Sequence, residues 1–298
     1  MKKFTIVDAH HHLWDLQAVH YPWLMERGVV RFFGDPAPIQ KDYRVSEFKS
    51  DIGELPVTQS VHIQVGAAAD HSLRETRWLQ SAADQSGGLP NAIVAFCDLS
   101  AEDAQAQLDA QGVYANLRGI RQIVGRSEAE DAVTGSGALL DDPNWRRNLA
   151  SLSQRGLSFD LQLIPPQLPR AIEVLGDCPD LAVALCHCGS PWDRSPEGLA
   201  FWKKQIAALA ELPTVHCKLS GFGMFDHDWN VTRVRDIALH VIDCFGPDRC
   251  MFGSNFPVDK LYRDYQTVFA NYFELVRDFT ESEQRTMLGG TAQRFYRI

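Results

Sequence analysis

Short apolar and β-branched runs recur along this chain, and a longer stretch with helical spacing follows each of them. Such alternation predicts a parallel sheet, because each helix carries the chain back to the edge where the next strand begins. Eight of these units in 298 residues predict an α/β protein with a (β/α)8 TIM barrel, and an open doubly wound sheet is the competing arrangement. The expected strands cover about residues 4–10, 58–65, 92–98, 117–123, 158–164, 182–187, 214–219 and 250–254.

The expected helices lie between these strands and often end near Gly or Pro. They cover residues 71–86, 101–111, 143–155, 166–176, 197–212 and 231–245. No segment between them has the composition of a linker, so residues 1–298 are expected to form a single domain.

The longest stretch without this alternation is an insertion after the first strand, residues 14–56. It contains the aromatic groups Tyr21-Pro22-Trp23 and Phe32-Phe33, followed by a short amphipathic segment at residues 42–51. Long loops after barrel strands lie on the catalytic face, so the insertion is expected to form a wall or lid over a pocket. The alternative is an aromatic plug that only covers the mouth of the barrel.

Composition narrows the class of partner. The net charge of -9 and the pI near 5.5 leave no basic stripe for a nucleic acid, so a small-molecule substrate is expected. No apolar stretch approaches the roughly 20 residues of a membrane span, and the first residues do not resemble a signal segment. We therefore expect a cytoplasmic protein without a membrane partner, as a monomer or small homo-oligomer.

Three consecutive histidines, His10, His11 and His12, end the first expected strand. Because alternate strand residues share a face, His10 and His12 are expected to converge on one spot while His11 points away. Such a pair binds a metal ion or polarises a carbonyl oxygen. A solvated histidine tract is the alternative, but the flanking apolar residues Ile6, Val7 and Leu13 argue against a loose tail.

Other polar side chains stand near the carboxyl ends of the expected strands, where TIM barrels carry their chemistry. In the second strand, Val61, Ile63 and Val65 are expected to pack on helices, which turns His62 and Gln64 inward. By the same alternation, inward positions in later strands are Gln162, His187, His216, Lys218 and Ser220. Buried polar groups of this kind are expected only where they have partners or a function.

The ordinary interpretation of several of these residues is structural. His62 and His216 are expected to be hydrogen-bonded core histidines, and Cys186 and Cys188 to pack toward the helices rather than bind zinc. Lys218 either pairs with a carboxylate or binds a substrate oxygen. Of the two arginines on strand four, Arg121 at the carboxyl side is the one expected to bind substrate.

Several sequence blocks resemble the amidohydrolase superfamily across nearly the whole chain. They are VDAHHHLWD, YPWL, HIQVGAAADHSLRETRWL, LRGIRQIV, LCHCGSPW, CKLSGFGM and FGPDRCMFGSNFPVD. Specifically, the chain resembles the amidohydrolase-2 group, which includes L-fuconolactonase, L-rhamnonolactonase and 2-pyrone-4,6-dicarboxylate lactonase. The resemblance implies that His10, His12 and His187 are catalytic and hold a divalent metal ion, zinc foremost, where one is present. Metal-independent members also occur in this group.

The eighth-strand position departs from the family pattern, because Asn255 stands where aspartate is usual. An amide has no basic oxygen, so Asn255 cannot be an ordinary general base. Either Asn255 positions the water while a histidine or Asp259 acts as the base, or a metal lowers the pKa of the water, or hydrolysis has been lost.

The resemblance and the polar lining together predict an enzyme of carbohydrate metabolism that opens a small lactone, most simply a sugar-acid lactone. Water attacks a carbonyl that is polarised by the histidines or a bound metal. The expected substrate-binding residues are Gln64, Arg121, Gln162, Lys218, Asp259 and Trp14. The alternatives are a metal-dependent decarboxylase of an aromatic or unsaturated acid and a non-catalytic sugar-acid binder.

Overall fold

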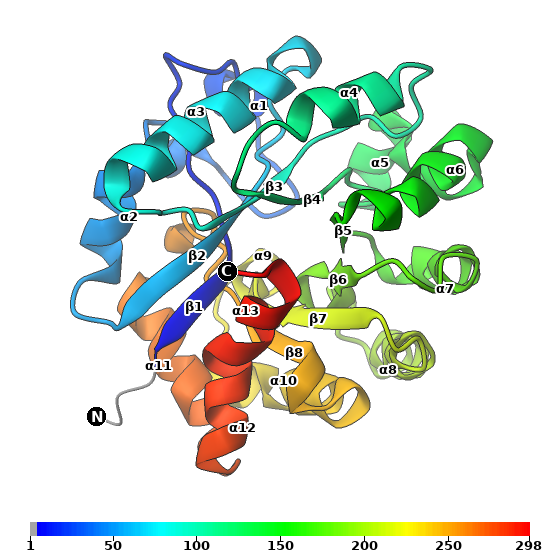
Figure 1. Ribbon diagram of the computed structural model, residues 1–298. Helices are drawn as coiled ribbons and strands as arrows, with labels where there is room; N and C mark the ends of the chain where they lie inside the picture. Colours follow the sequence, from blue (N-terminus) through cyan, green and yellow to red (C-terminus); the bar gives the residue numbers. More distant parts are fainter. Residues whose placement is uncertain (1–4) are drawn as a thin grey trace.

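Eight parallel strands form the barrel in chain order, which confirms the predicted (β/α)8 TIM architecture (Figure 1). The computed structural model describes residues 5–298, so the first residue expected in strand one, at position 4, lies outside the described part. At most carboxyl ends the expected strands are too long, because the chain leaves the sheet there and enters the loops that follow the strands. The strands are β1 (Ile6–His11), β2 (Val57–Ile63), β3 (Ala92–Ala95), β4 (Leu117–Ile120), β5 (Ser158–Leu161), β6 (Val183–Leu185), β7 (Val215–Leu219) and β8 (Cys250–Phe252).

Helices surround the barrel, and all six expected helices are present: five have at least one shifted end, and the helix at residues 231–245 has the expected bounds. The helices that follow β2 to β7 include α3 (Ser72–Ser86), α4 (Ala104–Gln111), α5 (Glu128–Thr134), α6 (Pro143–Ser151), α7 (Leu168–Gly176), α8 (Pro196–Ala210), α9 (Phe222–Phe225) and α10 (Val231–Phe245). The insertion after β1 adds α1 (Pro22–Met25) and α2 (Val45–Ile52), and the chain ends with α11 (Tyr265–Leu275), α12 (Glu281–Arg285) and α13 (Thr291–Tyr296). No helix within residues 5–298 is both long and apolar enough to cross a membrane.

Backbone hydrogen bonds between β1 and the segment after β8 bring the two ends of the sheet together. The amide of Asn255 donates to the carbonyl of His10 at 2.7 Å, and the amide of His12 donates to the carbonyl of Phe256 at 2.7 Å. Asp8 adds a side-chain link, because its Oδ1 accepts from the Ser254 amide at 2.8 Å. Asn255 is thereby fixed beside the histidines of β1.

An irregularity in β1 decides which side chains enter the barrel. Asp8 pairs with Ser60 and His11 with His62, so β1 carries one extra residue between these pairs. Asp8 consequently points outward, where its Oδ2 accepts from the hydroxyl of Tyr265 at 2.9 Å. Beyond the irregularity, His10 and His12 point inward as expected.

His11 points away from the barrel, as the alternation predicts. Its ring stacks on Phe48 of α2 with centroids 4.1 Å apart, and its Nε2 lies 2.9 Å from Ser60 Oγ. This side chain fastens the insertion to the outside of the barrel.

The predicted orientation of β2 is wrong. Val61 and Ile63 belong to the apolar cluster inside the barrel, so His62 and Gln64 face outward. His62 Nδ1 accepts the Leu13 amide at 3.0 Å, which fits its expected structural role. The error has a physical cause: β2 is buried on both faces at this level, and alternation alone does not distinguish inside from outside.

The amino-terminal end of the barrel is closed by α13 (Figure 1). Phe295 and Tyr296 pack with the interior apolar cluster, and the Tyr296 hydroxyl donates to Asp160 at 2.9 Å. Asp160 also forms an ion pair with Lys218 in which both side chains are fully buried. This pair lies in the closed part of the barrel.

The insertion after β1 forms a wall of a cavity at the carboxyl ends of the strands. Trp23 Nε1 donates to the Val65 carbonyl at 2.7 Å, which fixes α1 against the end of β2. Arg31 binds Glu130 of α5 through two nitrogens, at 2.6 and 3.0 Å. Two different barrel loops therefore hold the insertion in place.

We expect Lys218→Met to destabilise the protein by about 3–5 kcal/mol, because it leaves the buried Asp160 carboxylate without its cation. Arg146→Met, which breaks the exposed pair with Asp177, is the control and should cost less than about 1 kcal/mol. Urea unfolding measures both values. Equal costs for the two variants would contradict the role given to the buried pair.

Candidate active site

A cavity of about 220 Å³ opens at the carboxyl ends of the strands. It combines basic, amide and imidazole groups with an apolar wall from the insertion. The lining residues are His12, Pro22, Trp23, Arg31, Phe32, Phe33, Val65, Gly66, Arg121, Ile123, Arg126, Thr134, Gln162, His187, Met224, Asn255 and Val258. The structure thus brings five of the expected site residues together: His12, His187, Asn255, Arg121 and Gln162.

Two histidines face this cavity, and each is held through Nδ1. His12 Nδ1 donates to the Ile63 carbonyl at 2.7 Å, so a neutral His12 carries its lone pair on Nε2. His187 Nδ1 lies 2.9 Å from Ser220 Oγ, which leaves its Nε2 as the nitrogen available to a ligand. His187 sits on a left-handed turn with φ of 54°, and this turn carries its ring toward His10.

Burial keeps these imidazoles neutral. It lowers the pKa of His12 to about 3, and the neighbouring Arg121 guanidinium acts in the same direction. The pKa of His187 is also lowered well below its usual value. Burial is the largest cause, and the positive charge of Arg121 is the next. Both side chains therefore offer lone pairs at neutral pH.

Asn255 connects His12 to a buried acid. Asn255 Oδ1 lies 3.3 Å from His12 Nε2, and Asn255 Nδ2 donates to Asp259 Oδ1 at 3.0 Å. Burial raises the pKa of Asp259 to about 7. Asn255 has φ of 55°, a left-handed conformation that asparagine tolerates better than most residues.

Arg121 is a buried cation beside the histidines. Its guanidinium donates to Gln162 Oε1 at 2.8 Å and to the carbonyl of Gln64. Both partners are neutral, and its Nε has no hydrogen-bond partner within residues 5–298. Arg121 thus presents to the cavity a positive charge that no ion pair within residues 5–298 neutralises, although the Asp160 and Glu75 carboxylates act on it from further away.

Four predicted substrate contacts lie outside the cavity. Gln64 faces outward, its Oε1 accepts the Gly66 amide at 2.6 Å, and only its backbone carbonyl reaches Arg121. Lys218 forms an ion pair with Asp160 below the cavity. Of the two roles expected for Lys218, the structure therefore shows the pairing with a carboxylate. Trp14 is fully buried and donates to the Lys41 carbonyl at 2.6 Å. Asp259 lies behind Asn255 and positions it.

His10 lies beneath the cavity, against the other two histidines. Its ring centroid is 5.1 Å from that of His12 and 4.4 Å from that of His187. Neither of its buried nitrogens has a hydrogen-bond partner in the described chain. A ligand that accepts a nitrogen lone pair would satisfy His10, so the three neutral imidazoles fit zinc by donor type.

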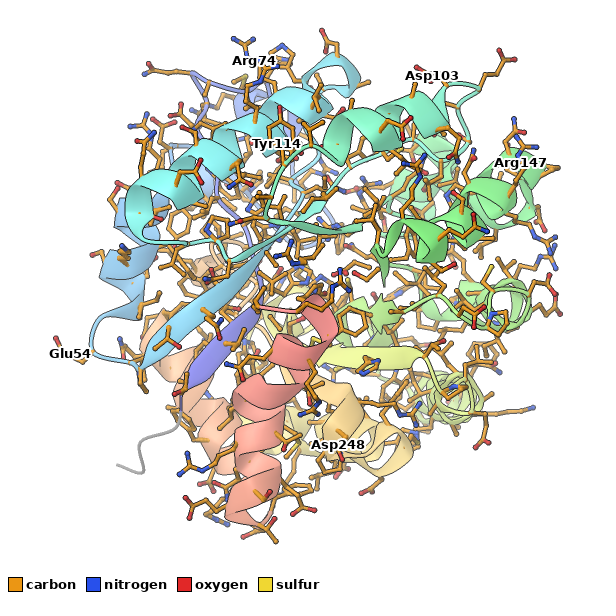
Figure 2. All side chains as sticks on the ribbon, viewed as in Figure 1. Glu54, Arg74, Asp103, Tyr114, Arg147 and Asp248 are labelled. Carbon is orange, nitrogen blue, oxygen red and sulfur yellow. The ribbon has the colours of Figure 1, made fainter. Side chains whose placement is uncertain are left out.

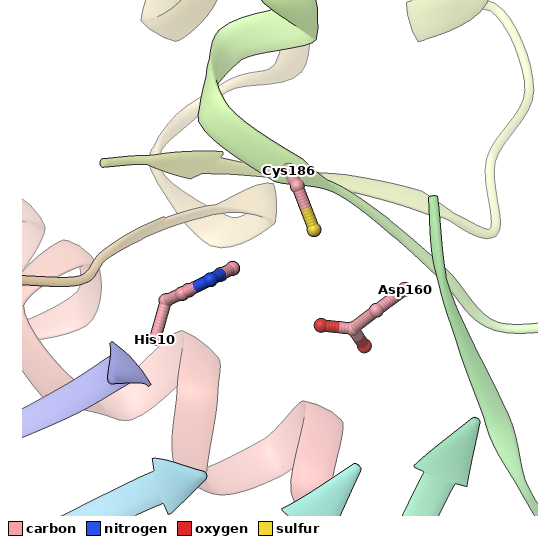
Figure 3. A group of neighbouring side chains, drawn as sticks. All are labelled: His10, Asp160 and Cys186. Carbon is pink, nitrogen blue, oxygen red and sulfur yellow. The ribbon is translucent and has the colours of Figure 1, made fainter. Parts of the chain in front are cut away.

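The expected ligands His10, His12 and His187 are not, however, the side chains that come closest together. Within residues 5–298, one group of three potential ligands has its ligand atoms all within 4.8 Å of one another. It consists of His10, Asp160 and Cys186 (Figure 3). The prediction that Cys186 packs toward the helices is therefore wrong, because its side chain points into the barrel. Burial raises the pKa of Cys186 to about 12, and Asp160 already binds Lys218, so this group is poorly suited to a cation.

Sequence reasoning missed several lining residues, among them Arg31, Arg126, Thr134 and Met224. Arg31 and Arg126 lie in loops far apart in sequence, and no spacing rule relates them. The aromatic groups of the insertion were the available signal, and Trp23, Phe32 and Phe33 do line the cavity.

A buried carboxyl, Glu75, stands behind the cavity wall and accepts the Val65 amide at 3.1 Å. Burial raises the pKa of Glu75 to about 7, although its hydrogen bond with Val65 opposes this shift. The folded protein therefore binds this proton more tightly than the unfolded chain does.

The fold and cavity together define a TIM-barrel protein with a histidine-rich site at the carboxyl ends of its strands. The amidohydrolase family model matches residues 7–298, so the chain belongs to the amidohydrolase family. It is 36% identical to an uncharacterized protein, y4mH, from Sinorhizobium fredii over the full length of both chains. It is 29% identical to an L-fucono-1,5-lactonase from Burkholderia multivorans, covering 98% of this chain and 96% of that one. A crystal structure of a Burkholderia multivorans amidohydrolase with bound zinc superposes with a TM-score of 0.83 at 25% identity, covering 98% of this chain and 99% of that one.

The stability of Glu75→Gln should depend less on pH than that of the parent. The folded pKa of Glu75 lies above its unfolded value of 4.5, so the parent loses stability as pH rises from about 4.5 through 7. The advantage of Glu75→Gln should therefore be small at pH 4.5 and largest above pH 7. Melting temperatures of the parent and the variant across this pH range test the prediction. Glu54→Gln, at an exposed position, is the control and should follow the pH dependence of the parent (Figure 2). An advantage that shrinks as pH rises would contradict the assignment.

Proposed function

We propose that this protein hydrolyses a small lactone to its hydroxy acid. The observation that carries the proposal is the pairing of a neutral imidazole, His12, with a buried cation, Arg121, in one small cavity. Ester hydrolysis needs a base for the attacking water and a positive group for the developing oxyanion, and these two side chains supply both.

The chemistry follows from the hydrogen bonds of each group. The water oxygen bonds to the lactone carbonyl carbon while His12 Nε2 takes a proton from the water. Once protonated, Nε2 donates to Asn255 Oδ1, which already lies 3.3 Å away. This contact gives the amide a role that needs no basicity: it stabilises the imidazolium.

Arg121 and Gln162 hold the carbonyl oxygen as negative charge develops on it. The ring C–O bond then breaks, and the imidazolium returns its proton to the alkoxide that leaves. The product is a hydroxy acid that contains every atom of the lactone and the water. His187 lines the cavity with its Nε2 unused by Ser220, and in this proposal it holds the water before attack.

The size and walls of the cavity support a single small ring as the substrate. A volume of about 220 Å³ is below the range of roughly 300–1,000 Å³ that is usual for drug-sized ligands. Trp23, Phe32 and Phe33 provide apolar faces on which a sugar ring packs. The similarity to a relative named L-fucono-1,5-lactonase points in the same direction.

A divalent metal ion, with zinc foremost, is part of the proposal as an optional cofactor. When the ion is bound, His10, His12 and His187 would hold it, so His12 would then be a ligand rather than the base. The ion would in that case supply the activation of the water and Lewis acidity toward the lactone carbonyl. The relative solved with bound zinc supports zinc as the ion. Elemental analysis of the purified protein, before and after chelation, measures the metal content directly.

The proposal predicts turnover of at least one member of a panel of aldonolactones in a pH-indicator assay, with chelator or with added zinc. His12→Ala should lower kcat by about 10²- to 10⁴-fold, because it removes the base. His20→Ala, an exposed histidine outside the cavity, is the matched control and should keep parental activity. The absence of turnover across the panel, or an active His12→Ala variant, would refute the proposed reaction.

We expect Asn255→Asp to lose activity by about tenfold or more. A carboxylate at this position would face Asp259, and two adjacent carboxyl groups cannot both ionise readily. The pair would share a proton and disturb the contact with His12. Initial rates of the parent and the variant test this expectation. A large gain from an inactive parent would instead show that the natural asparagine abolishes hydrolysis.

A further inference from the structure

A second hollow, of about 340 Å³, adjoins the cavity that holds the histidines. Phe32, Arg126 and Met224 line both spaces, so the two are neighbours. The second space, called the outer hollow below, contains none of the groups assigned to the proposed reaction. Its other lining residues are Ser127, Trp192, Phe225 and His227.

Loops that follow four different strands build the outer hollow. Phe32 comes from the insertion after β1, Ser127 from the loop after β4 and Trp192 from the loop after β6. Phe225 and His227 come from the segment after β7. Because these loops follow the carboxyl ends of the strands, the outer hollow lies on the face that carries the candidate active site.

Aromatic side chains extend from the cavity into the outer hollow. The Phe33 ring lines the cavity, and its centroid lies 5.2 Å from that of Phe32, which lines both spaces. Trp192 is 43% exposed and is the one exposed tryptophan of the seven. Within residues 5–298, its indole packs on no other ring and its nitrogen has no hydrogen-bond partner. The outer hollow therefore offers an indole face without a partner from the protein.

Phe32 is held in place before any ligand arrives. It lies in a tight turn that is closed by two backbone hydrogen bonds of 2.9 Å between Arg31 and Gly34. The Phe32 amide also donates to Glu130 Oε1 at 3.3 Å. A ligand that packs on this ring loses little affinity to ordering the turn, because the turn is already formed.

Polar groups at the edge of the outer hollow suit hydroxyls. Ser127 Oγ accepts the Glu130 amide at 3.2 Å, which leaves its own hydrogen free to donate. His227 is exposed, and its ring stacks on Tyr262 with centroids 4.0 Å apart. Its ring nitrogens have no hydrogen-bond partner in the described chain, so they also stay available.

The charge in this region is balanced. Glu130 and Asp131 are acidic neighbours of the Arg126 guanidinium, and Glu130 also pairs with Arg31. A neutral ligand therefore fits the outer hollow better than an anion does. Flat apolar faces beside hydrogen-bonding edge groups match a sugar ring, which has C–H faces and a rim of hydroxyls.

We propose that the outer hollow binds a second, uncharged sugar ring that is joined to the reacting lactone, so that the substrate is the lactone of a disaccharide acid. This inference rests on the proposed lactone hydrolysis and extends its substrate beyond the one ring that the cavity holds. The second ring packs on Trp192 and Phe32, and its hydroxyls reach Ser127 and His227. The bond between the two sugars stays intact, because the outer hollow only binds.

Lactams test this subsite without turnover, because the ring N–H that replaces the ester oxygen makes them resistant to ring opening. Glucono- and galactono-1,5-lactam are compared with the same lactams carrying a glucosyl or galactosyl ring at O4 or O6. Isothermal titration calorimetry on the full-length protein should show at least one disaccharide lactam binding about tenfold or more tightly than its parent lactam. Equal affinities in every pair, or no binding by any lactam, would overturn the proposal.

A benzyl group in place of the second sugar tests whether the outer hollow prefers a sugar to a purely apolar ring. The benzylated lactam packs on the same aromatic faces but offers no hydroxyl to Ser127 or His227. It should bind more weakly than the disaccharide lactam with the same attachment. Tighter binding of the benzyl compound would overturn the sugar assignment.

Variants of Trp192 assign the gain in affinity to one side chain. Trp192→Ala should weaken binding of the disaccharide lactam by about five- to tenfold and leave the parent lactam unaffected, whereas Trp192→Phe should keep part of the gain. Phe201→Ala is the matched control, because Phe201 of α8 is 41% exposed and lies outside both spaces. A folded Trp192→Ala variant with the full disaccharide gain would contradict the assignment.

Failure of this inference is distinguishable from failure of the proposed reaction. A protein that hydrolyses monosaccharide and disaccharide lactones equally well is a lactonase whose outer hollow binds no second ring. A protein that prefers disaccharide lactams but opens no lactone has the subsite, and the proposed reaction is then wrong.

Discussion

The burial of Arg121 is the constraint on which the site depends. Its guanidinium donates hydrogen bonds to the Gln64 carbonyl after β2 and to the Gln162 side chain after β5. Both of these acceptors are neutral. This buried charge helps to keep His12 and His187 neutral. A positive charge beside unprotonated imidazoles is the arrangement that ester hydrolysis uses, with a base for water and a cation for the oxyanion.

The rest of the barrel holds this arrangement in place. Lys218 and Asp160 neutralise each other in the closed end, where Tyr296 joins them, so that cation does not reach the cavity. At the open end, the irregularity in β1 turns Asp8 outward and sends His10 and His12 inward. Asn255 receives its position from backbone hydrogen bonds that close the barrel, and Asp259 fixes its amide.

Much of the architecture was predictable because strand and helix periodicity is a local signal. The alternation located all eight strands, and it correctly placed Lys218 of β7 and Gln162, which follows β5, inside. The predicted orientation of Gln64 was wrong because a buried strand is apolar on both faces. That of Cys186 was wrong because a left-handed turn follows it and interrupts the alternation. Arg126 was not foreseen, since a loop whose path depends on the Gln162 carbonyl and on Asp131 has no local pattern.

Parallel measurements of turnover and unfolding free energy on Arg121→Met test the central claim most directly. If Arg121 stabilises the oxyanion, the ring-opening rate constant should fall by about 10²- to 10³-fold, as for the loss of an oxyanion donor. The unfolding free energy should then fall by no more than about 1–3 kcal/mol, because the substitution leaves the Gln64 carbonyl and Gln162 Oε1 without a donor but strands no carboxylate. The opposite result, a large loss of stability with near-parental turnover per folded molecule, would show that Arg121 only ties β2 to β5 and would contradict the account.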